Sequence, residues 1–135
     1  MFKKLFLTMA CLMAAVTVFA APGYTFSQRT KEAAAESFLG SMAFKDYEGN
    51  WKLIAPDAIK ALMKEEKIAS VDAAKKFYID AMKEAMEDAD LAKMLQEVYK
   101  NPEMKKGFVD EMLKKNEKAF VKINGKWYID MSKMK

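Results

Sequence analysis

Residues 118–131 contain two β-prone runs, rich in Val, Ile, Phe, Trp and Tyr, on either side of Asn124-Gly125. This dipeptide accepts the positive φ angles of a type I′ turn, whose twist matches the two strands that it joins. A two-residue loop pairs Phe120 with Ile129, and one face of the hairpin then carries four large apolar side chains: Phe120, Trp127, Ile129 and Met131. Because an isolated hairpin is marginally stable in water, this one must pack against helices or a further strand.

Residues 1–21 have the three parts of a secretory signal peptide. Two early lysines precede an almost wholly apolar run over residues 5–21, which ends in the small residues Ala20 and Ala21. This run is shorter than the roughly 20 residues that a membrane-spanning helix needs. We therefore predict that residues 1–21 are a signal peptide cleaved near Ala20 or Ala21. Residues 22–135 are then a single domain exported to the periplasm or the cell exterior.

Cys11 is the only cysteine of the chain and lies inside the predicted signal peptide. A lipid anchor at Cys11 is disfavoured, because Thr8 stands where a lipobox usually has Leu and apolar residues follow the cysteine. After cleavage the domain has no cysteine, so its core alone must hold it together. Its length of about 115 residues is enough for one core and not for two.

Basic and acidic residues are nearly balanced. The chain has 23 Lys and Arg residues against 19 Asp and Glu residues, and removal of Lys3 and Lys4 leaves 21 basic residues. Lysines and acids alternate along the chain, whereas a nucleic-acid-binding protein clusters its basic residues into a patch. We expect no nucleic-acid partner, and no membrane span once the signal peptide has been removed.

Hydrophobic periodicity and capping residues predict helices along most of the remaining chain. The expected segments are residues 31–45, 47–54, 56–67, 71–88, 91–100 and 102–116. The expected N-caps are Ser27 or Thr30, Ser70, Asp88 or Asp90, and Asn101. No linker or internal repeat interrupts these segments. The predicted fold is α+β and mostly helical, with five or six short helices packed on a small C-terminal antiparallel sheet.

Three of these helices have apolar stripes that we expect to face the core. Residues 31–45 are expected to form an amphipathic helix whose buried stripe is Ala35, Phe38, Leu39 and Met42. In residues 71–88 the expected buried face is Ala74, Phe77, Tyr78, Ala81, Met82 and Ala85. In residues 102–116 it is Met104, Phe108, Met112 and Leu113.

Two short motifs lie near opposite ends of the predicted domain. Residues 46–57 contain Asp-Tyr, then Trp, then Leu-Ile-Ala-Pro-Asp, and residues 124–130 are Asn-Gly-Lys-Trp-Tyr-Ile-Asp. Together they resemble small exported bacterial domains of unknown function in the nuclear transport factor two-like superfamily. The resemblance implies a cone-like domain in which helices pack on a curved sheet and often enclose an apolar pocket. It covers residues 28–66 and 118–131, whereas the family has further strands where residues 71–116 have helical periodicity.

The chain has no histidine. This excludes Ser-His and Cys-His nucleophilic pairs, an imidazole base, and the usual zinc and haem ligand sets. The resemblance implies an Asp/His pair for enzymes of the superfamily, which this chain cannot supply. An acid–base pair made of carboxylates alone remains open. Its candidates are Asp46, Asp57, Asp80 and Asp130, and helix capping or solvation is the competing explanation for each.

No metal site and no cofactor are expected. The acids within residues 84–90 form a cluster, but a calcium loop needs ligands at alternating positions and a glycine turn, whereas these acids follow a helical pattern. The pairs Met82/Met86 and Met131/Met134 have spacings that allow Cu(I) chelation. Most of the methionines nevertheless fall on apolar stripes, where thioethers fill gaps in a core.

Six aromatic residues are candidates for the lining of a ligand pocket between helices and sheet: Tyr47, Trp51, Phe77, Tyr78, Phe108 and Trp127. An ordinary core is the alternative for the same residues. The preferred hypothesis is a non-catalytic exported domain that binds a small apolar or amphipathic ligand, or a partner protein of the cell envelope. The alternatives are a histidine-free hydrolase or isomerase with a carboxylate base, and a purely structural interaction module.

Overall fold

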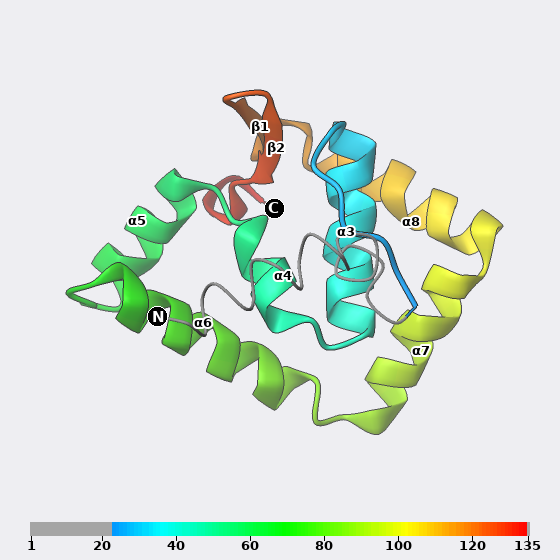
Figure 1. Cartoon of the computed structure of the whole chain (residues 1–135), viewed down its shortest axis with the longest axis horizontal. Helices are drawn as coiled ribbons and strands as arrows, with labels where there is room; N and C mark the ends of the chain where they lie inside the picture. Colours follow the sequence, from blue (N-terminus) through cyan, green and yellow to red (C-terminus); the bar gives the residue numbers. More distant parts are fainter. Residues whose placement is uncertain (1–22, 135) are drawn as a thin grey trace, which may run out of the picture.

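The computed structural model describes residues 23–134, which form six α-helices followed by a β-hairpin (Figure 1). The helices are α3 (Lys31–Ala43), α4 (Tyr47–Lys52), α5 (Pro56–Glu65), α6 (Val71–Ala85), α7 (Ala89–Lys100) and α8 (Pro102–Lys115). The 3₁₀ helix η1 (Glu117–Ala119), the strands β1 (Phe120–Ile123) and β2 (Lys126–Ile129), and the 3₁₀ helix η2 (Met131–Lys133) follow. The predicted mostly helical α+β class with a small C-terminal antiparallel sheet is confirmed.

The hairpin has the predicted register, in which Phe120 pairs with Ile129. Asn124 and Gly125 have φ angles of 51° and 81°, which are the positive values that a type I′ turn requires. Phe120 and Ile129 belong to the buried core, and Trp127 and Met131 pack against it. The predicted apolar face of the hairpin is therefore the face that docks on the helices.

The second edge of β2 is covered by two segments from earlier in the chain. The N–H of Trp127 donates to the carbonyl of Gln28 at 2.9 Å. The N–H of Ile129 donates to the carbonyl of Leu53 at 2.7 Å, and the N–H of Ala55 donates to the carbonyl of Ile129 at 2.8 Å. These bonds satisfy backbone groups that an open strand edge would leave unpaired, and they fix the α4–α5 connection against the hairpin.

Helix α3 lies in the middle of the molecule, between α4 on one side and α7 and α8 on the other (Figure 1). The prediction of an amphipathic helix here is wrong, because buried residues occur around most of its circumference. They are Ala34, Ala35, Ser37, Leu39, Gly40, Ser41 and Ala43. Most of these side chains are small, which lets neighbouring elements approach the α3 backbone closely.

The predicted N-caps of four helices are confirmed. Thr30, Ser70, Asp88 and Asn101 each accept hydrogen bonds from backbone N–H groups of the first turn that follows. The helix ends are less well predicted, because α3 and α5 end two residues before the expected positions. Lys45 and Lys67 follow these ends with φ angles of 58° and 55°, the left-handed conformation that commonly ends a helix and usually selects glycine.

The buried faces of α6 and α8 differ from the prediction. In α6 the buried residues are Ala74 and Met82, whereas Phe77 is 43% exposed. In α8 the buried residues are Val109 and Met112, whereas Phe108 is 37% exposed. Both helices pack on one side only, α6 on α4 and α5 and α8 on α3 and α7, so a single narrow stripe of each is covered. The sequence offers more apolar residues than this stripe can hold.

Residues 71–116 are occupied by α6, α7 and α8, and within residues 23–134 the only sheet has two strands, extended by one parallel bridge between Ile54 and Ile129. No helix in this part of the chain is long and apolar enough to cross a membrane. The predicted signal peptide at residues 1–21 lies outside the described residues.

Candidate functional site

One face of α5 forms the wall of an apolar groove. Ala58, Ala61, Leu62 and Glu65 line it, at the spacing i, i+3, i+4 and i+7 that places four side chains on one side of a helix. Pro56 starts α5 because proline needs no hydrogen-bond acceptor in the first turn and already has a helical φ angle. The extended residues before Pro56 are bonded to β2, so the hairpin fixes the position of this wall.

The other walls come from α4, α6 and η2, which lie around α5 at the left and centre of Figure 1. Among residues 23–134, the lining of what we call the α5 groove is Trp51, Ile54, Ala58, Ala61, Leu62, Glu65, Tyr78, Met131 and Ser132. Its volume is about 260 Å³. The rings of Trp51 and Tyr78 contact each other with centroids 5.5 Å apart and planes inclined at 51°. Apart from Glu65 and Ser132, every lining side chain is apolar or aromatic.

A chain of buried hydrogen bonds holds Tyr78 in place. Its hydroxyl donates to Oδ1 of Asn50 at 2.5 Å and lies 3.7 Å from the sulfur of Met131. The amide of Asn50 donates to Oγ of Ser41 at 2.9 Å, and that hydroxyl donates to the carbonyl of Phe38 at 3.0 Å. Burial raises the pKa of Tyr78 above its ordinary range, so the hydroxyl stays protonated and keeps its role as a donor.

Asp130 fixes η2 beside the groove. Its carboxylate is buried and accepts a hydrogen bond from the N–H of Ser132 at 3.1 Å and another from the Ser132 hydroxyl. The ammonium of Lys133 lies 3.7 Å from the second carboxylate oxygen. These bonds cap the 3₁₀ turn and set the positions of Met131 and Ser132 in the groove wall.

The structure brings together two of the six predicted pocket aromatics, Trp51 and Tyr78. Tyr47 does not line the groove, and the ammonium of Lys83 is 5.9 Å from its ring centroid. Phe77 and Phe108 are exposed, and Trp127 packs on the main core. Phe77 is adjacent to Tyr78 in a helix, so the two side chains point about 100° apart, and Phe77 lies on the exposed side of α6.

None of the four candidate carboxylates lines the α5 groove. Asp46 accepts from the N–H of Gly49 at 3.0 Å and from the hydroxyl of Tyr24, as an N-cap of α4 does. Asp57 is exposed in the first turn of α5. Asp80 is exposed and pairs with Lys76 at 2.7 Å, and this hydrogen bond lowers the pKa of the Asp80 carboxyl. Asp130 is the buried cap of η2 described above.

Glu65 is the carboxylate that sequence reasoning missed. It is the last residue of α5 and, of the described residues that line the groove, the only charged one. Among the described residues it takes part in none of the five ion pairs. The spacing of Glu65 from Ala58, Ala61 and Leu62 could have indicated that all four share one face of α5. The sequence also offers the face with Ile59 and Met63, and only the position of α6 shows which face lines the groove.

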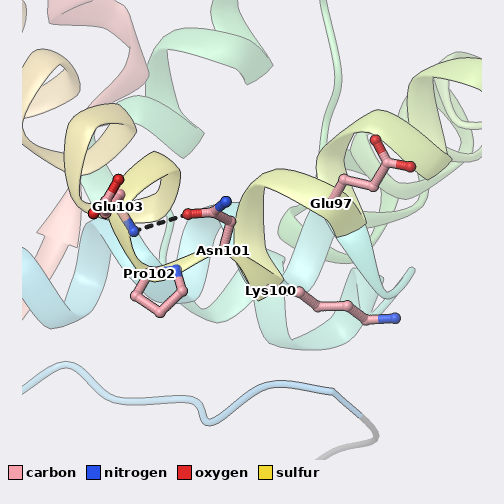
Figure 2. Close-up of a pocket in the computed structure, with 5 residues that line it drawn as sticks. All are labelled: Glu97, Lys100, Asn101, Pro102 and Glu103. Atoms are coloured by element: carbon pink, nitrogen blue, oxygen red, sulfur yellow. Dashed lines mark hydrogen bonds between the residues drawn. The ribbon is translucent and has the colours of Figure 1, made fainter.

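Two other hollows lie where neighbouring segments of the chain meet. Figure 2 shows the first, of about 630 Å³, at the α7–α8 corner: Asn101 accepts from the N–H of Glu103 at 3.0 Å, while Glu97 and Lys100 extend away from it. The second, of about 500 Å³, lies between residues 26–29 and the hairpin turn. There the Gln28 side chain already donates to the carbonyl of Trp127 at 2.9 Å. The α5 groove is the most apolar of the three.

Within the described residues, no three His, Cys, Asp or Glu side chains are grouped so that they could hold a metal ion. Comparisons with protein-family models, with curated proteins and with solved structures find no match to this chain. The geometry of the groove is therefore the basis for inferring the function of this chain.

Proposed function

We propose that this chain is a non-catalytic exported domain that binds a small apolar or amphipathic molecule in the α5 groove. The observation that carries the proposal is the lining, in which Trp51, Tyr78, Met131 and the aliphatic residues of α5 enclose about 260 Å³ beside only two polar side chains. Ligand sites are typically concave and apolar, with a few polar groups that fix orientation. The volume limits the ligand to something smaller than a typical drug molecule.

The alternative functions have weaker support. A carboxylate enzyme needs an acid or base that reaches the substrate, and Asp46 and Asp130 instead hold backbone N–H groups and hydroxyls. An interaction module needs a continuous apolar patch. The exposed large apolar side chains are distributed over three helices: Val71, Phe77, Met94, Met104 and Phe108.

The relationship to the nuclear transport factor two-like superfamily, with its cone-like arrangement, also remains a proposal. What supports it is that the two segments with the resemblance lie together: the connection over residues 53–55 is hydrogen-bonded to β2. What departs from the superfamily pattern is the run of helices over residues 71–115.

The proposal is tested by blocking the groove. Ala61→Phe places a ring in the groove, whereas Ala81→Phe places the same ring on the exposed side of α6 and serves as the matched control. We expect Ala61→Phe to weaken binding of the neutral apolar dye N-phenylnaphthylamine by about tenfold or more, because the ring occupies the site, and Ala81→Phe to leave it unchanged. Native mass spectrometry of the protein from the exported fraction of its host should show a discrete small adduct that Ala61→Phe removes.

If the two variants bind the dye equally, the dye binds elsewhere and the α5 groove is not the site. If the wild-type protein also has no adduct, ligand binding as the function of this domain is contradicted. A melting temperature for each variant separates blocked binding from misfolding.

A further inference from the structure

We propose that the α5 groove selects small organic cations, specifically ammonium groups with methyl or short alkyl substituents that diffuse freely in solution. This inference rests on the proposed function and specifies its ligand. It follows from two aromatic rings and one carboxylate residue in a site where the part of the lining that the structure describes contains no basic residue.

Trp51 and Tyr78 supply the aromatic surfaces that favour a cation. Rings inclined at 51° with centroids 5.5 Å apart form adjacent walls of the groove, not a parallel stack. The faces of Trp and Tyr attract cations through the quadrupole of the ring, and tryptophan does so most strongly. Because the Tyr78 hydroxyl is bound to Asn50, its ring is held in position before a ligand arrives.

Glu65 supplies the negative charge that favours a cation. Glu65 lines the groove with an exposed side chain, and among the described residues it takes part in no ion pair. Glu65 also ends α5, and the carbonyl groups at a helix C-terminus add partial negative charge. The neighbouring Lys60 and Lys64 are exposed and do not line the groove. The charge of Glu65 therefore favours a cation over an anion, and a neutral ligand would leave the carboxylate unused.

The substituents on the ammonium follow from the rest of the lining. Ile54, Leu62 and Met131 offer apolar contact, which favours methyl or alkyl groups over the strongly hydrated N–H bonds of a simple ammonium ion. A volume of about 260 Å³ suits a free small molecule. The Ser132 hydroxyl is already bound to Asp130, so it adds little competing polarity.

The test compares choline with its neutral isostere, in which a carbon atom replaces the ammonium nitrogen. With methyl-labelled methionine, NMR should show the Met131 signal shifting on titration while the signal of Met104, which lies on α8, stays fixed. We expect choline to bind about tenfold more tightly than the neutral isostere. Glu65→Gln and Trp51→Leu should each remove most of this preference, whereas the matched control Glu66→Gln, one residue beyond α5, should leave it unchanged.

The outcomes separate this inference from the proposed function. Equal binding of choline and the neutral isostere, or an unchanged preference in Glu65→Gln, would overturn the cation selectivity and leave apolar ligand binding standing. Failure of both compounds to shift Met131 would overturn the cation inference, and the dye experiment above would then decide on the groove itself. Binding to phosphatidylcholine vesicles without binding to free choline would show a lipid headgroup as the ligand and overturn the assignment to a free molecule.

Discussion

Asn50 connects the candidate site to the centre of the molecule. Asn50 is fully buried. Its side chain accepts a hydrogen bond from the Tyr78 hydroxyl of α6 and donates one to the Ser41 hydroxyl of α3. A buried amide without partners costs folding free energy, so these bonds fix the relative positions of three helices as well as the Tyr78 ring. Tyr24 has a comparable role near the N-terminal end of the described chain, where its hydroxyl donates to the Asp46 carboxylate.

The raised pKa values of these two tyrosines predict that the folded protein loses stability at alkaline pH. Burial is the main cause that raises the pKa of both above the ordinary value of 10.0, and for Tyr24 the hydrogen bond to Asp46 adds to it. Above about pH 10 the unfolded chain releases protons that the folded protein still holds. The stabilisation is therefore complete below pH 10 and is lost as pH rises beyond it. We expect the free energy of unfolding in urea to fall by up to about 1.4 kcal/mol per pH unit for each tyrosine.

Tyr24→Phe and Tyr78→Phe distinguish this effect from lysine titration in the same range. Each variant should have a shallower decline above about pH 10, because one of the two hydroxyls is gone. Tyr78→Phe should also cost about 1–3 kcal/mol at neutral pH, since Oδ1 of Asn50 loses its donor. A decline equal to that of the wild type in both variants would show that these hydroxyls do not cause it.

At the scale of the elements, two glycines in open space allow the effect of backbone conformation on stability to be measured separately from packing. An added Cβ at Gly125 or at Gly107 would have no atom within 4 Å. Gly125 has a φ angle of +81° in the hairpin turn, whereas Gly107 lies within the helix α8. The two sites therefore differ in backbone conformation and not in packing.

The matched substitutions should have opposite effects. Gly125→Ala forces a Cβ into the left-handed region and should destabilise the protein by about 1 kcal/mol. Gly107→Ala should stabilise it by about 1 kcal/mol, because alanine is the better helix former. Urea unfolding midpoints measure both changes. A stabilising Gly125→Ala would be incompatible with the type I′ turn.

At the scale of the whole molecule, the N-terminal segment ties several elements together. The Tyr24 ring is stacked on Phe44 and meets the edge of Tyr99 from α7. It also lies directly on α3, since a Cβ at Gly40 would be 2.5 Å from the ring. Cleavage after Ala20 or Ala21 would leave this anchor within the mature chain.

We therefore predict that the exported protein has the mass of residues 21–135 or 22–135. Small residues precede both bonds, as signal peptide cleavage requires. Intact mass spectrometry of protein from the exported fraction decides the question. The mass of the full chain, or of a chain that begins with a lipid-modified Cys11, would contradict the predicted signal peptide.

The sequence by itself determined the features that depend on neighbours along the chain. The hairpin and its register follow from Asn124-Gly125, because the preference for positive φ angles is local. The N-caps at Ser70 and Asn101 follow from side chains that reach backbone groups two or three residues ahead. These interactions form between residues close together in the chain, so the sequence pattern is enough to predict them.

Tertiary structure alone decided which faces are buried and where the groove lies. Phe77 and Tyr78 are both aromatic and adjacent, yet only Tyr78 points inward. Its hydroxyl contacts Asn50 of α4 and Met131 of η2 there. Glu65 became a site residue only when α5 was placed beside α6. Burial is a property of pairs of surfaces, so periodicity shows that a helix has an apolar face, and the neighbouring elements decide which residues of it are covered.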